Sequence, residues 1–127
     1  EEWLKLLDPK FKWVSVQYGN TGHELKEMNL IDPKWDGIDM DEFAGLVQSC
    51  DHIITVCNTT VHFAGALNKP CWVLVPDKPA WRYGSFSDRM LWYPSVRLYR
   101  QKPGEAWSEV IGRLKNDLQS LGLRAAA

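Results

Sequence analysis

A regular alternation of strand and helix patterns in the middle of the chain constrains the fold most. His52 to Val56 and Cys71 to Val75 are short, β-rich apolar runs. Between them, residues 59–67 carry apolar side chains at helical spacing, and Asn68 suits a left-handed helix end before Pro70. Strand, helix and strand within about 25 residues predict a βαβ unit with parallel strands and a right-handed crossover. We expect the first of these strands to be buried on both faces.

The flanking sequence adds elements to this unit. We expect further strands over 12–17 and 96–99, and helical segments over 2–7, 23–28, 41–50 and 105–121. Asp41 is the expected N-cap of the third helical segment. Trp107 is expected on the buried stripe of the last, and Trp3, Leu4 and Leu7 on one face of the first. The pattern predicts an α/β, Rossmann-like parallel sheet with flanking helices, in one domain over 1–127.

Composition excludes several functional classes. The 127 residues are 45% apolar and 24% charged, as in ordinary globular domains. A net charge of −1 without a basic cluster argues against nucleic-acid binding, and no apolar run reaches the roughly 20 residues that a membrane span needs. The three cysteines form no CxxC pair, so we expect reduced, buried thiols in a cytoplasmic protein rather than a disulfide or a metal site. The three scattered histidines likewise predict no metal site.

The junction between the first central strand and the following helix is the strongest candidate site. Asn58, Thr59 and Thr60 stand where a parallel strand ends and a helix begins. Ligands of open α/β sheets bind at this edge, and a helix N-terminus offers free N–H groups and a positive dipole end. The arrangement suits a diphosphate, although neither a Walker loop nor a GxGxxG motif is present.

Each candidate residue also has a purely structural interpretation. Asn58 or Thr59 can be a plain N-cap, with or without a ligand. His62 can face the cleft or be a satisfied core histidine. Gly65, inside the helix, points to close packing of helix on sheet. Gln17, at the end of the strand expected over 12–17, can reach a ligand at the same edge or be simply solvated.

An aromatic, irregular connection follows the second central strand. Trp81, Arg82 and Tyr83, with Trp92 and Tyr93, can form a stacking surface for a base or a sugar. The alternative is that these aromatic side chains lock irregular backbone onto the core. The sequence alone leaves both interpretations open.

Several colinear motifs resemble one family. The runs 51–67 and 69–76, with Trp81-Arg82-Tyr83-Gly84, 92–101 and 14–17, are similar to the C-terminal domain of bacterial heptosyltransferase-like glycosyltransferases. Within that family, the chain resembles the branch in which tetratricopeptide repeats precede such a domain. The similarity spans residues 12 to 101.

The resemblance implies the donor-binding half of a two-domain GT-B enzyme. Its substrate would be a nucleoside-diphosphate sugar, with no separate cofactor. Asn58, Thr59, Thr60 and His62 would face the donor diphosphate and sugar, and the base or ribose would lie near Gln17 and the loop 37–40. The family commonly has Asp-Thr where this chain has Cys57-Asn58, which removes an acidic donor contact.

The resemblance also implies what other parts of the enzyme contribute. The acceptor site and the acceptor-activating residue would lie in a missing N-terminal domain, so no residue here is expected to be catalytic. The first strand of the family's C-terminal domain is also expected to be missing, and the fragment alone to be inactive. A non-catalytic interaction module with the same fold is the main alternative, for which Cys57 is the support. An unrelated flavodoxin-like or receiver-type domain is a third, although neither an acidic phosphorylation pocket nor a flavin loop is evident.

Overall fold

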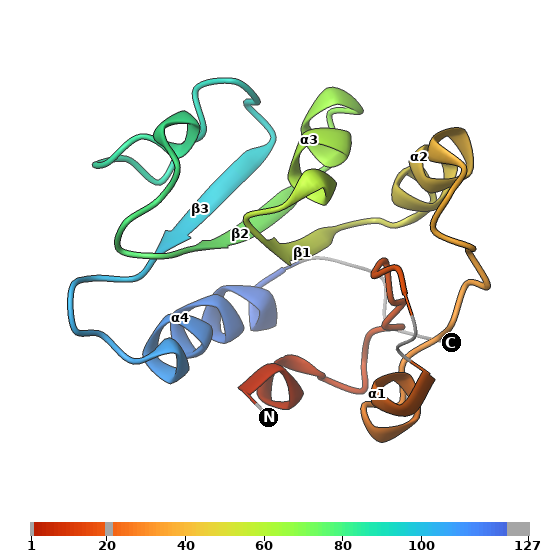
Figure 1. Cartoon of the computed structure of the whole chain (residues 1–127). Helices are drawn as coiled ribbons and strands as arrows, with labels where there is room; N and C mark the ends of the chain where they lie inside the picture. Colours follow the sequence, from red (N-terminus) through yellow and green to blue (C-terminus); the bar gives the residue numbers. More distant parts are fainter. Residues whose placement is uncertain (1, 20–21, 122–127) are drawn as a thin grey trace.

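The protein has an α/β architecture, in which a parallel sheet lies between helices (Figure 1). The computed structural model describes residues 2–19 and 22–121. Its sheet has the strand order β1-β2-β3, with β1 (Ile53–Val56), β2 (Cys71–Val75) and β3 (Val96–Arg100). The helices are α1 (Gly22–Glu27), α2 (Met40–Ser49), α3 (Thr59–Ala66) and α4 (Trp107–Gln119), with short 3-10 segments η1 (Glu2–Leu6) and η2 (Trp81–Tyr83). The predicted fold class is confirmed as a parallel sheet with flanking helices.

The central βαβ unit forms as the sequence predicts. Strand β1 pairs in parallel with β2 from Ile53 opposite Cys71 to Val56 opposite Leu74, and α3 connects the two strands. The left-handed φ of 52° at Asn68 ends the connection just before β2. Strand β2 also pairs in parallel with β3, and all five of its residues are buried. All three strands therefore end at the same edge of the sheet.

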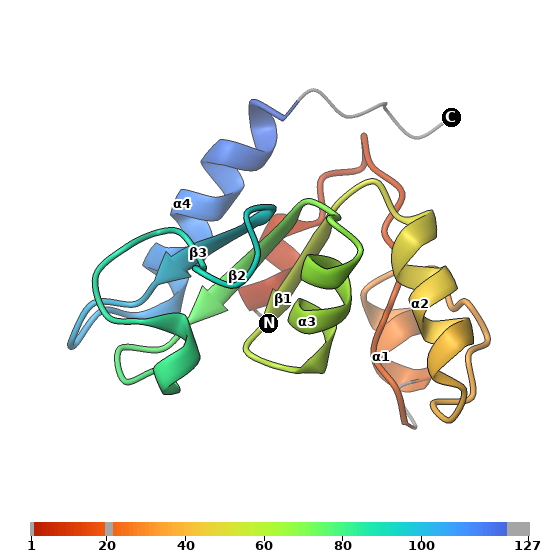
Figure 2. The same cartoon turned by 90° about the horizontal axis from the view of Figure 1, so that it is seen from above.

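The two faces of the sheet carry separate apolar clusters. Alternate residues of β2 point to opposite sides, so Val73 packs on the α3 side and Trp72 on the α4 side. Figures 1 and 2 show α3 over one face and α4 with η1 over the other. The α3-side cluster includes Phe43, Val47, Ile53, Val61, Ala64, Val73, Tyr83 and Leu98. The α4-side cluster includes Leu6, Phe11, Trp72, Leu74, Tyr99, Val110, Leu114 and Leu118.

Strand β1 is less buried than its sequence predicts. Ile53 and Thr55 are buried on the α3 side, but Ile54 is only half-buried and Val56 is 44% exposed. The expectation of burial on both faces is therefore wrong. Within the described residues β1 is an edge strand, and the α4-side cluster is built around β2 and β3, which leaves the other face of β1 partly uncovered.

The strand predicted over 12–17 does not form. Instead, a single parallel bridge joins Val14 to Ile31. Trp13 packs with the α4-side cluster and Val16 with the α3-side cluster, so this segment lies across both apolar layers. The segment is held by the packing of its side chains on both apolar clusters rather than by a regular ladder of backbone hydrogen bonds.

Several helix ends differ from the sequence prediction. Helix α2 is capped by Asp39 rather than Asp41, because the Asp39 carboxylate accepts from the N–H groups of Asp41 (2.9 Å) and Glu42 (3.1 Å). Trp107 is 38% exposed because α4 begins there, at the end of its buried stripe.

The helical segment expected over 2–7 is a 3-10 segment with a different buried residue. Its inward side chain is Leu6, whereas Trp3 and Leu4 are exposed. The 3-10 geometry has three residues per turn, so the positions that share a face differ from those of the α-helix that the sequence pattern suggested.

Candidate functional site at the carboxyl edge of the sheet

The N-terminus of α3 lies where β1 leaves the sheet. Asn58 has an extended backbone, with φ −152° and ψ −174°, and its side-chain oxygen accepts from the Thr60 N–H at 3.0 Å. The Thr55 hydroxyl donates to the same oxygen at 3.2 Å. Asn58 is therefore an N-cap, as the structural interpretation predicted.

The cap leaves backbone donors for a ligand. The N–H groups of Asn58 and Thr59 donate no hydrogen bond within residues 2–19 and 22–121. Both residues are exposed, whereas Thr60 is buried and serves the helix. Two free N–H donors at the positive end of an eight-residue helix can bind an anion while Asn58 still caps the helix.

The Cys57 thiol points away from this opening. Its Sγ lies 3.7 Å from the Leu74 carbonyl oxygen, beneath the junction. Burial raises the pKa of Cys57, and the neighbouring Tyr83 hydroxyl with the charges of Arg82 and Arg100 only partly offsets the rise. The thiol therefore stays protonated at neutral pH and is not a nucleophile.

The Tyr83 hydroxyl closes the space below Cys57. Tyr83 is 2% exposed, and its hydroxyl has no hydrogen-bond partner of normal geometry among the described residues, although it lies near the thiol. Burial raises the pKa of Tyr83 to about 12, and the adjacent Cys57 adds to the rise. This pair links η2 to the β1–α3 junction without supplying a charged group.

His62 has a structural partner. Its Nδ1 lies 3.1 Å from the Tyr93 hydroxyl, and the ring is half-buried. A Cβ added to Gly65 would lie 2.2 Å from the Tyr93 ring, so this glycine admits an aromatic side chain of the connection after β2. The predicted close packing at Gly65 is real, but the contact is with Tyr93 rather than with the sheet.

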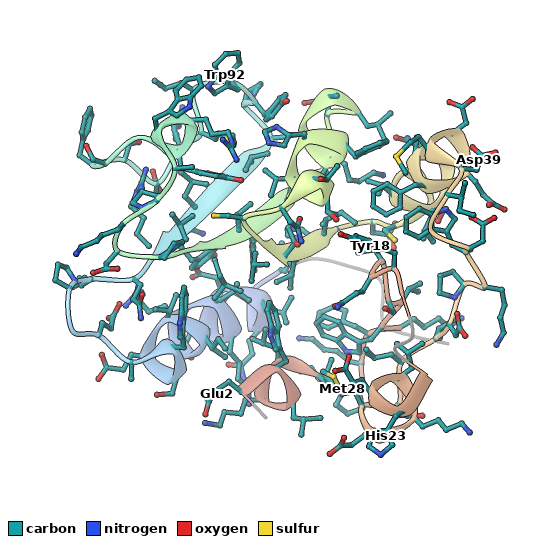
Figure 3. The ribbon with its side chains drawn as sticks, viewed as in Figure 1. Glu2, Tyr18, His23, Met28, Asp39 and Trp92 are labelled. Atoms are coloured by element: carbon teal, nitrogen blue, oxygen red, sulfur yellow. The ribbon has the colours of Figure 1, made fainter. Side chains whose placement is uncertain are left out.

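The aromatic connection faces both inward and outward. Tyr83 and Tyr93 pack toward the core, whereas Trp81 and Trp92 are 78% and 60% exposed. Trp81 and Trp92 line a hollow of about 580 Å³, together with Arg82, Gly84 and Leu91. We call this the tryptophan hollow. Figure 3 shows Trp92 at the outer rim of the molecule, on the α3 side of the sheet.

Arg100, at the end of β3, holds this connection in place. Its guanidinium donates to the carbonyl oxygens of Ser87 (2.7 Å), Gly84 (3.0 Å) and Tyr83. The sequence does not predict this role, because an arginine at a strand end carries no signal for carbonyl partners that lie 13 to 17 residues earlier.

Gln17 lies apart from the α3 residues. It is exposed and lines a second hollow of about 320 Å³ with Ser15, Gly19, Gly22, Leu25, Asp32, Pro33, Lys34 and Trp35. None of these lining residues belongs to α3, and the loop 37–40 lines neither hollow. In Figure 3, Tyr18, the residue after Gln17, lies on the α2 side of α3, away from Trp92. Asn58 and Thr59 therefore lie exposed at the start of α3, Thr60 is buried and His62 contacts Tyr93, whereas Gln17 lines a separate hollow.

Within 2–19 and 22–121, no three His, Cys, Asp or Glu side chains are grouped so that they could hold a metal ion. Over the same ranges, no helix combines the length and the apolar character that crossing a bilayer requires.

The chain is similar in sequence to a known bacterial protein. Protein FlbA of Caulobacter vibrioides is 29% identical to this chain over 119 residues, which cover 87% of this chain and 20% of FlbA. The chain thus spans about a fifth of the length of that relative. No protein-family model and no solved structure matches the chain.

Proposed function

We propose that this chain is the donor-binding domain of a GT-B-type glycosyltransferase and binds a nucleoside-diphosphate sugar. The observation that carries the proposal is the pair of free N–H donors at Asn58 and Thr59, at the carboxyl edge of a parallel sheet. Free N–H donors at a helix N-terminus stabilise a diphosphate, both when the donor binds and when it leaves.

The proposal assigns only part of the reaction to this chain. Glycosyl transfer also needs an acceptor hydroxyl that is activated and aligned with the anomeric carbon. We assign these tasks to another domain of the parent protein, which tetratricopeptide repeats would accompany. The free thiols of Cys50, Cys57 and Cys71 favour a cytoplasmic location for the parent protein, since structural disulfides are rare there.

One observation favours the alternative of a non-catalytic module. The family's acidic residue is replaced by Cys57, whose thiol is directed inward to the Leu74 carbonyl. A module of this kind would keep the fold but lose affinity for nucleotides.

A titration with UDP, ADP and GDP, followed by amide-resolved NMR, tests the proposal. We expect saturable shifts concentrated at residues 58–62 with one nucleotide, which would also identify the base. If no nucleotide moves these amides at millimolar concentration, the donor-domain proposal fails and the module is favoured.

The substitution Thr59→Pro sharpens this test. Proline at the first helical position removes the Thr59 N–H but fits the helix, and the extended backbone of Asn58 tolerates a following proline. We expect unchanged stability and an affinity about ten- to a hundredfold weaker, since a charge-assisted hydrogen bond is worth about 1.5 to 3 kcal/mol. Thr60→Ser is the matched control, because Thr60 is buried and its backbone N–H bonds Asn58. Equal affinity of Thr59→Pro and the unmodified chain would contradict a diphosphate at this helix end.

A further inference from the structure

Packing explains the tryptophan hollow only in part. The indoles of Trp81 and Trp92 make an edge-to-face contact, with centroids 6.0 Å apart and an interplanar angle of 69°, and their outer surfaces meet in an angled notch at the hollow. Both indoles are mostly exposed, and Leu91 beside them is 93% exposed. The exposed side chains do not contribute the stabilisation that burial of their apolar surface would give the fold. An exposed apolar surface of this kind beside a cation indicates a binding site.

The backbone beneath the notch is held rigidly. The Arg100 guanidinium bonds the carbonyl oxygens of Tyr83, Gly84 and Ser87, and the positive φ of 64° at Gly84 turns the chain after η2. Tyr83 is anchored in the core below. The two indoles are therefore presented on a fixed support, which reduces the ordering cost of binding a ligand.

The charge in the hollow is positive. Arg82 is exposed and lines the hollow, and it forms no ion pair with the part of the chain that the structure describes. Its guanidinium lies over the Tyr83 ring, 5.6 Å from the ring centroid. No carboxylate lines the hollow. An occupant of the hollow thus gains from a negative charge beside Arg82.

We propose that the tryptophan hollow binds a sugar ring that carries an anionic group, with the ring against Trp81 and Trp92 and the anion on Arg82. A sugar has apolar C–H faces for the indoles and hydroxyls for the solvent side. The notch suits such a ring better than a flat base, because indoles 69° apart cannot sandwich a planar ring. Its volume of about 580 Å³ is within the usual range for small-ligand sites. This inference rests on the proposed function, in which the sugar of the donor extends from the diphosphate at α3.

The anionic sugar can come from two sources, which different probes distinguish. Glucose 1-phosphate represents the glycosyl phosphate of a donor, and glucuronate represents an acidic sugar. Glucose and inorganic phosphate are the controls that carry only the ring or only the charge. The readout is the indole N–H resonances in NMR, where the other five tryptophans of the chain are internal references.

We expect glucose 1-phosphate to shift the Trp81 and Trp92 indole resonances saturably and the other five little. If glucuronate shifts them equally, the site is specific for acidic sugars in general rather than for glycosyl phosphates. No shift with either anionic sugar, or equal shifts with inorganic phosphate, overturns the proposal.

Substitutions separate the contributions of ring and charge. We expect Trp81→Ala and Trp92→Ala each to weaken glucose 1-phosphate about tenfold, which corresponds to about 1.4 kcal/mol. Arg82→Gln should remove the preference for glucose 1-phosphate over glucose. Trp107→Ala, at a partly exposed tryptophan on α4, is the matched control and should change nothing. Unchanged affinity in both Trp81→Ala and Trp92→Ala also overturns the proposal.

Failure of the sugar-site proposal can be distinguished from failure of the proposed function. Nucleotide-induced shifts at residues 58–62 without a sugar response at Trp81 and Trp92 would sink only the sugar site. A sugar response without nucleotide binding would instead retain the hollow and reject the donor-domain assignment.

Discussion

At the scale of single residues, the contact between Gly65 and Tyr93 is the most sharply defined in the site. Gly65→Ala places a methyl group inside the Tyr93 ring, so the ring must move and the His62 hydrogen bond to its hydroxyl is lost. We expect the free energy of unfolding to fall by about 1 to 3 kcal/mol, as overpacked cores do. Urea denaturation measures this loss.

Gly45→Ala in α2 is the matched control for Gly65→Ala. No atom lies within 4 Å of the methyl group that it adds, and alanine favours the helix. We expect it to raise the free energy of unfolding by up to about 1 kcal/mol. If both variants change stability by the same amount and sign, the Tyr93 contact is not the cause.

His52 makes the stability depend on pH. Its ring packs edge-on against Trp72, with the ring centroids 4.5 Å apart. Burial lowers the pKa of His52 to about 4, although the hydrogen bond between its Nδ1 and the Ile53 carbonyl acts in the opposite direction. The unfolded chain therefore binds a proton more readily, so stability is full above about pH 6.5 and falls as the pH drops toward 4. The loss is at most about 3 kcal/mol.

A comparison with His52→Phe isolates this contribution from that of the carboxyl groups. Phenylalanine keeps the contact with Trp72 but does not titrate. We expect urea denaturation between pH 7 and pH 4.5 to show a shallower decline for the variant. Parallel curves for the two proteins would exclude His52 as the cause.

At the scale of elements, β3 supports the connection that follows β2. Arg100→Gln removes most of the bonds to the carbonyls of Tyr83, Gly84 and Ser87. We expect a loss of about 2 to 3 kcal/mol, typical of hydrogen bonds to a charged group. Amide hydrogen exchange should increase over residues 81–87 but not in α4.

Arg97→Gln is the control within the same strand. Arg97 lies on the opposite face of β3 from Arg100 and forms ion pairs with Asp88 and Asp117. Its side chain is 46% exposed. Exposed ion pairs contribute about 0 to 1 kcal/mol, so we expect a small effect and no change of exchange over 81–87. Equal effects of the two substitutions would mean that Arg100 acts only through its charge.

At the scale of the whole molecule, the site is assembled from segments that are distant in sequence. Helix α3 supplies the anion donors, η2 and the residues around Trp92 supply the aromatic notch, and β3 supplies the anchor. The start of α3 and the end of β3 lie at the carboxyl edge of the parallel sheet, and Arg100 holds η2 there, whereas Trp92 lies in the segment that leads into the start of β3. Ligand binding and loop order should therefore depend on the same tertiary contacts.

The sequence by itself determined the parts of the fold that depend on local pattern. The apolar run of β2, the helical spacing of α3 and the cap at Asn58 predicted the βαβ unit and the edge where the candidate site lies. These features need only residue periodicity and capping chemistry, which act over a few neighbouring residues.

Only the tertiary structure decided the features that depend on distant partners. Gln17 lines a separate hollow, the segment 12–17 forms no strand, and Val56 is exposed because the far face of β1 is incompletely covered. The same holds for the Tyr93 ring over Gly65 and for the carbonyls that Arg100 bonds. The physical reason is that burial and hydrogen bonding at these positions are set by side chains far away in sequence, which no local pattern encodes.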